Sequence, residues 1–161
     1  PGDPLICIGT STTHFDTRKK GEWGGNLSRF QLVVPSPMAR KKGKTQRGTL
    51  SARCLDNTGE RYYQVIEFDE GDHDQQAALL FELAQYAPLC MAVLSGGKSL
   101  HGWFDVKKSD SHLQLAFMRK AVQLGADPAT WTPCQFVRMP DGTRGNGVRQ
   151  SIVYFNPENI Q

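Results

Sequence analysis

The alternation of hydrophobic and polar residues becomes regular after residue 60. Strands are expected where β-branched, aromatic and other apolar residues alternate with polar ones, and helices where apolar residues recur every three or four positions. The pattern predicts strands over 61–69, 89–95, 100–106 and 149–155, and helices over 73–86 and 110–125. The order β-α-β-β-α-β is that of a ferredoxin-like sheet.

The first sixty residues are richer in turns and carry shorter strand-like segments. Strands are expected over 4–9, 29–35 and 50–56, and a loop rich in glycine and lysine precedes the last of them. We therefore predict one α+β domain, in which an N-terminal part (1–60) packs on a ferredoxin-like half (61–161) with a cleft between them. A short strand over 135–139 is expected before the final one. The chain begins within a turn-like stretch, so we expect a fragment of a larger protein.

The period of two assigns side chains in the expected sheet to opposite faces. In a ferredoxin-like sheet the first and third strands are central neighbours, so Ile66, Phe68 and the apolar residues of 100–106 are expected to face the helices. The polar residues expected together on the other face are Glu67, Asp69, His101, Trp103 and Asp105.

Glu67 and Asp69 form a pair of carboxylates at the end of the first regular strand. Two carboxylates ~4 Å apart repel by roughly 4 kcal/mol at an effective dielectric of about 20. Mg²⁺ or Mn²⁺ offsets such repulsion, because hard cations prefer oxygen ligands and paired metals serve phosphoryl-transfer enzymes. The alternative is that both acids are simply solvated.

Residues 92–99 fit a loosened phosphate-binding loop. Such a loop needs a helix after it, because the helix N-terminus supplies the amides that hold phosphates. Residues 100–106 alternate with a period of two and predict a strand, which argues against a P-loop hydrolase. The turn can still bind an anion, with Lys98 and His101 close by. Trp103 either stacks a base or packs against residues 1–60.

Charge is separated along the chain, although the net charge of +3 over 161 residues is mild. Basic residues gather in 17–20, 39–47 and 138–149, and acidic residues gather in 67–74. This separation is typical of a protein that binds a polyanion on one surface and cations on another.

The four cysteines show no zinc-ligand spacing, and no apolar run approaches the ~18 residues of a membrane span. We therefore expect neither a zinc site nor a membrane protein. Free thiols make a reducing cytoplasm the expected location.

These features resemble the archaeo-eukaryotic primase superfamily, which includes primase-polymerases of plasmids and phages. Glu67 and Asp69 in "EFD" are similar to its first motif, and Ser99 and His101 in "SGGKSLH" to its second. A later acid followed by a basic residue, here Asp127 and Arg138, resembles its third motif. Asp105, expected on the face of His101, remains the alternative third acid.

The resemblance implies template-directed nucleotidyl transfer by two Mg²⁺ or Mn²⁺ ions, with a single-stranded DNA template, a primer and an NTP or dNTP as partners. The implied metal ligands are Glu67, Asp69 and Asp127, and His101 joins them in catalysis. The residues implied to bind the triphosphate are Ser95, Lys98, Ser99, His101, Arg138, Arg144 and Arg149. The residues expected at the template are Arg40, Lys41, Lys42, Lys44 and Trp103. A helicase domain or protein is a further expected partner.

Three other functions stay open at this point. The strand order is shared with RRM-like modules that bind nucleic acid without catalysis, although these present aromatic side chains on the open face. A palm-type nucleotide cyclase would use the same carboxylate pair. A catalytically inactive relative would bind only DNA or a helicase.

Overall fold

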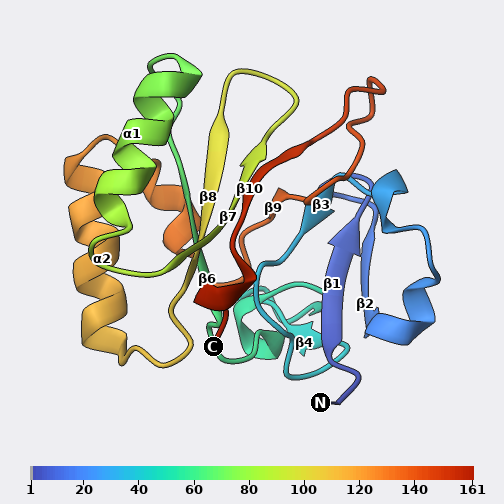
Figure 1. The fold of residues 1–161 in the computed structure, drawn as a ribbon. Helices are drawn as coiled ribbons and strands as arrows, with labels where there is room; N and C mark the ends of the chain where they lie inside the picture. The colour runs from blue at the N-terminus through green and yellow to red at the C-terminus, as the bar shows by residue number, and fades with distance from the viewer. Residues whose placement is uncertain (1) are drawn as a thin grey trace.

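The computed structural model describes residues 2–161 as an α+β protein with two four-stranded antiparallel sheets and two helices (Figure 1). The first sheet has the order β2-β1-β3-β9, and its strands are β1 (Leu5–Gly9), β2 (Phe15–Lys19), β3 (Leu32–Val33) and β9 (Val137–Arg138). The second has the order β10-β7-β8-β6, and its strands are β6 (Tyr63–Glu67), β7 (Leu89–Leu94), β8 (Leu100–Asp105) and β10 (Ile152–Phe155). The remaining elements are the hairpin β4 (Gly43–Lys44) and β5 (Leu50–Ser51) and the helices α1 (His73–Leu83) and α2 (Ser111–Gln123).

Both helices cover one face of the second sheet (Figure 1). As predicted, Ile66, Phe68 and Phe104 lie in the core beneath these helices. Gly102 allows the close approach of α1, because a Cβ at this position would lie 2.5 Å from Leu80 Cδ2. The regular alternation of β6 and β8 is therefore explained by burial against helices.

The other face of the second sheet is covered by the first sheet. Val65, Val93 and Trp103 form a buried cluster with Val137 of β9, and Val33 of β3 packs against it. Trp103 is 6% exposed. Of the two roles considered for Trp103, the structure supports packing, and its ring is not accessible to a template base.

The strand order differs from the expected one. We expected β6 and β8 at the centre, whereas the central pair is β7 and β8, with β10 beside β7 and β6 at the edge. The outer edge of β6 is occupied by the chain after α2: the Asp127 amide donates to the Glu67 carbonyl at 3.0 Å, and Gln64 Nε2 donates to the Thr130 carbonyl at 3.0 Å. Because this edge is taken, β10 adds to the opposite edge.

Two parts of the N-terminal prediction were wrong in detail. Strand β2 was missed because "FDTRK" shows no clear hydrophobic alternation, yet it pairs with β1 along its whole length. The strands expected over 29–35 and 50–56 are reduced to Leu32–Val33 and Leu50–Ser51. The short strand expected near 137 exists, but it joins the first sheet, where Arg138 pairs with Leu32.

All four cysteines are free and buried. In the part of the chain that is described, no helix is both long and apolar enough to span a bilayer.

Candidate functional site

A cleft of about 450 Å³ opens where the second sheet meets the first. One wall is built from the end of β6, the β7–β8 turn and the segment after α2. The opposite wall comes from β3, β9 and the β1–β2 loop. The residues lining the cleft include Thr12, Leu32, Glu67, Asp69, Ser95, Lys98, Ser99, His101, Asp127, Gln135, Phe136, Arg138 and Arg144.

Three carboxylates gather on the first wall. Glu67, Asp69 and Asp127 each offer an oxygen atom within 4.8 Å of the others. The backbone sets this arrangement: Glu67 ends β6, and the amide of Asp127 donates to the Glu67 carbonyl at 3.0 Å. One Asp127 oxygen, Oδ1, caps the 3₁₀ helix Pro128–Trp131 by accepting from the Ala129 amide at 2.9 Å.

Asp105, the alternative third acid, lies elsewhere. It pairs with Tyr63 at the far end of β6, and its separation from His101 by four strand residues corresponds to ~13 Å. Its carboxylate accepts the amides of Lys107 at 3.0 Å and Gln161 at 2.9 Å. The structure therefore groups Asp127, not Asp105, with Glu67 and Asp69.

Burial and neighbouring acids make Glu67 hard to ionise. Desolvation, followed by the charges of Asp127 and Asp69, raises the pKa of Glu67 to about 7. Arg138 acts in the opposite direction but does not cancel these effects. An acid held half-protonated at neutral pH inside a cleft is a common property of functional sites.

His101 lies directly against this acid, with 3.3 Å between His101 Nε2 and Glu67 Oε2. Burial lowers the pKa of His101 to about 4, and the positive charges of Arg138 and Arg144 contribute. The imidazole is therefore neutral at pH 7, so this contact is not an ion pair. His101 Nδ1 is buried and has no hydrogen-bond partner among residues 2–161.

The acidic cluster fits a divalent cation. Its donors are carboxylate oxygens only, the ligand type preferred by Mg²⁺ and Mn²⁺. Across residues 2–161, the one basic side chain within 4.0 Å of these carboxylates is the neutral His101. A bound divalent cation would supply positive charge that no charged side chain of residues 2–161 brings into contact with these carboxylates.

The β7–β8 turn supplies the anion-binding features expected beside the acids. Gly96 adopts a φ of +72°, and Ser95 Oγ accepts the Ser99 amide at 3.3 Å, which fixes the turn. Arg144 crosses it and donates to the Ser95 carbonyl at 3.4 Å. A Cβ at Gly97 would lie 2.9 Å from Arg144 Nη1, so glycine leaves room for the guanidinium.

Arg138 reaches the cleft from the opposite wall. It is half-buried on β9, and its Nη1 donates to Gln31 Oε1 at 3.3 Å. Six of the seven residues expected at the triphosphate thus line the cleft. Arg149 does not: it is exposed and pairs with Asp141 at 3.2 Å.

Gln76 is a positioning residue that the sequence analysis missed. Its fully buried amide donates to the carbonyls of Glu70, Gly71 and Lys98, each at 3.2 Å, and accepts the Leu100 amide at 2.7 Å. It therefore links α1 to the loop carrying Asp69 and to the turn before His101. The sequence does contain a signal for this role. Gln76 lies one helical turn before the buried Leu80, on the same face of the helix.

Comparison with protein families, with curated proteins and with solved structures finds no match for this chain. We therefore infer function from the geometry of the cleft and the chemistry of its residues.

We predict that Gln76→Met destabilises the protein by about 2–3 kcal/mol, because the Leu100 amide and the Lys98 carbonyl lose their buried partner. Urea unfolding measures this loss. Gln85→Met, at an exposed position just after α1, is the control and should change stability by less than about 0.5 kcal/mol. Equal stability of the two variants would remove the positioning role of Gln76.

The raised pKa of Glu67 predicts a pH-dependent effect of Glu67→Gln. Because the folded protein keeps a proton up to a pKa of about 7 that the unfolded chain releases near 4.5, the wild type loses stability as pH rises through this interval. The variant lacks this loss. Without divalent metal, the free energy of unfolding of Glu67→Gln should exceed that of the wild type only slightly near pH 4.5, and by on the order of 3 kcal/mol at about pH 8. A difference that does not change with pH would contradict the burial of this acid.

Proposed function

We propose that this protein catalyses template-directed nucleotidyl transfer, as a DNA primase or polymerase that uses two Mg²⁺ or Mn²⁺ ions. The observation that carries the proposal is the pairing, within one cleft, of three clustered carboxylates with Lys98, Arg138 and Arg144. Phosphoryl-transfer sites require both features, because metal ions neutralise the reacting phosphates and fixed cations hold the remaining charge.

Glu67, Asp69 and Asp127 would hold the metal ions, which when bound supply charge neutralisation and favour the deprotonated primer 3′-hydroxyl. Glu67 would enter this role by losing a proton, and with a pKa of about 7 it is about half-ionised at neutral pH. The imidazole of His101, with Nε2 3.3 Å from Glu67 Oε2, would orient the Glu67 carboxylate without adding a charge, since it is neutral.

The triphosphate would lie between the β7–β8 turn and β9. Arg138 suits this role because its planar fork pairs two phosphate oxygens at once, and its contact with Gln31 holds the guanidinium in place. Arg144 lies across the turn, and Lys98 is exposed at its tip. These groups belong to two different sheets, so a bound triphosphate would lie across the cleft.

The same residues carry the resemblance to the primase-polymerase superfamily, and part of the topology supports it. Strand β8 lies between β6 and β7, which α1 connects, as in the split β-α-β unit of a ferredoxin-like half. The position of β10 beside β7 departs from that arrangement. We propose that residues 61–161 form a ferredoxin-like half, because they contain the β6-α1-β7-β8 unit.

One observation weighs against an RRM-like binding module. Such modules stack bases on aromatic side chains of the open sheet face. Here that face is covered by the first sheet, and Trp103 is buried within the contact. No specific observation favours a cyclase.

Asp69→Ala should abolish nucleotide incorporation on a primed single-stranded DNA template while leaving the fold intact. The loss follows from removing one of three metal ligands and should exceed about a hundredfold. Glu70→Ala, which removes the neighbouring exposed acid outside the cluster, is the control and should keep activity. Retained incorporation by the Asp69 variant would refute the metal-centred mechanism. If the wild type is inactive, metal-dependent triphosphate binding by the same proteins tests whether only catalysis is missing.

A further inference from the structure

We infer that a basic surface remote from the cleft binds the phosphate backbone of the template strand several nucleotides away from the reacting end. This "distal basic surface" consists of residues 16–22, residues 40–47 and Asp56. The inference deepens the proposed function, since a template is the nucleic acid that such an enzyme would hold.

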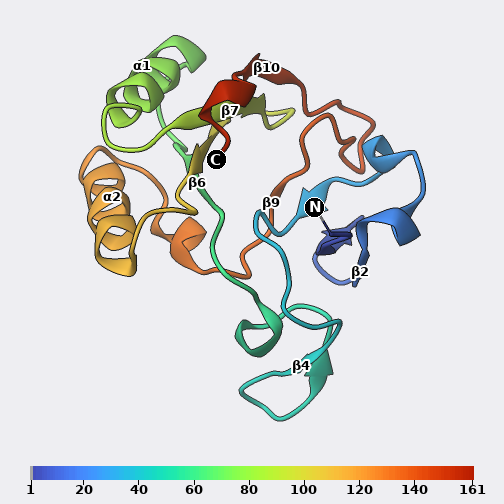
Figure 2. The ribbon, with the colours of Figure 1, turned by 60° about the horizontal axis from the view of Figure 1, so that its bottom comes forward.

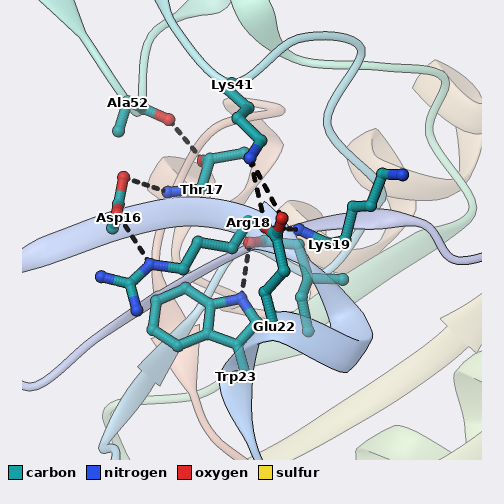
Figure 3. Close-up of polar contacts among 9 residues, drawn as sticks. Asp16, Thr17, Arg18, Lys19, Glu22, Trp23, Lys41 and Ala52 are labelled. Carbon is teal, nitrogen blue, oxygen red and sulfur yellow. Dashed lines mark hydrogen bonds and ion pairs between the residues drawn. The ribbon is translucent and has the colours of Figure 1, made fainter.

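Two segments far apart in the sequence form this surface. Lys41 Nζ lies 3.2 Å from Glu22 Oε2, and the Lys19 amide donates to the same carboxylate at 3.0 Å (Figure 3). Glu22 lies on the 3₁₀ helix Lys20–Trp23, directly after β2. The loop that begins at residue 40 is thereby held against the end of β2.

Positive charge is concentrated here beyond the average of the chain. The surface carries eight Lys or Arg residues against the three acids Asp16, Glu22 and Asp56, a net charge of +5, whereas the whole chain carries +3. Each of the three acids pairs with a basic residue of the same surface. In the described part of the chain, the lysines with no carboxylate within 4.0 Å include Lys19, Lys20, Lys42 and Lys44.

The arrangement suits a phosphate backbone. The paired cations are held in place, as in Arg18, which bonds Asp16 at 2.8 Å and lies 4.7 Å from the centre of the Trp23 ring (Figure 3). The unpaired lysines are exposed and flexible point charges, which neutralise phosphates without reading sequence. Such contacts fix the position of a strand, and base pairing at the cleft would supply the sequence information.

The distal basic surface and the cleft lie at opposite ends of the same strands. The cleft lies at the end of β6, where Glu67 is. Lys19 lies at the other end of the molecule, because it pairs with Leu5 at the start of β1. Met38 bridges both Leu5 and Thr58, so the start of β1 lies near the chain that leads into the start of β6. In Figure 1 the β7–β8 turn lies at the top, and β4 and the N-terminus lie at the bottom; Figure 2 brings this lower end toward the viewer. The length of β6 alone is ~13 Å, which corresponds to about four nucleotides of a stacked strand.

The test is the affinity of the whole chain for oligothymidylates of about 2 to 20 nucleotides, measured by fluorescence anisotropy between about 50 and 200 mM salt. The variant Lys19→Gln/Lys20→Gln/Lys42→Gln should weaken binding of the long oligonucleotides at least tenfold and reduce the salt slope by about 2, since each lost single-strand contact contributes ~0.7. Binding of the shortest oligonucleotides and of a nucleoside triphosphate with Mn²⁺ should stay unchanged.

The matched control is Lys108→Gln/Arg119→Gln/Lys120→Gln, which removes the same charge near and on α2, and it should bind like the wild type. Equal weakening in both variants would overturn the inference, because net charge alone would explain it. Unchanged long-DNA binding in the first variant would also overturn it and would favour an acidic protein as the partner. The wild type could bind long oligonucleotides more tightly than short ones, lose this preference in the first variant, and yet incorporate no nucleotide. That result would refute the proposed catalysis and still support the distal basic surface.

Discussion

The structure of the site depends on holding three carboxylates within 4.8 Å of one another against their mutual repulsion. The backbone does this, because the Asp127 amide is bonded to the carbonyl of Glu67 and the chain after α2 is fixed along the edge of β6. Burial and, after it, this repulsion raise the pKa of Glu67 to about 7. The proposed pair of hard divalent cations would offset the repulsion, because carboxylate oxygens are the ligands such ions prefer.

The cleft exists because two sheets meet over a buried apolar contact and separate at one end. Val33 and Val137 of the first sheet pack on the face of the second. Arg138 follows Val137 on β9 and so lies opposite the acids, although 71 residues separate it from Glu67 in the sequence. Arg138 is thereby placed opposite the acids, whereas the β7–β8 turn with Lys98 lies on the acidic wall, where the neutral imidazole of His101 contacts Glu67.

Local patterns in the sequence were sufficient for the strands and helices of the second sheet and for the acidic pair, but not for the strand order of that sheet. The period of two over 100–106 identified a strand and removed the P-loop hypothesis, and β8 confirms it. Three features depended on long-range contacts that no local pattern encodes. These are the polar strand β2, the covering of the edge of β6 by residues 126–131, and the transfer of β9 into the first sheet. The choice between Asp127 and Asp105 was undecided for the same reason, since it depends on where the chain after α2 returns to the sheet.

The most direct test of the account is a titration of Mn²⁺ followed by its electron paramagnetic resonance signal, with and without a nucleoside triphosphate, for the wild type, Asp127→Asn and Asp74→Asn. Asp74 is an exposed acid of α1 outside the cluster. The account predicts that the wild type and Asp74→Asn bind Mn²⁺ more tightly when the triphosphate is present, and that Asp127→Asn loses at least tenfold in Mn²⁺ affinity. Identical titrations for all three proteins would contradict a metal centre built from Glu67, Asp69 and Asp127.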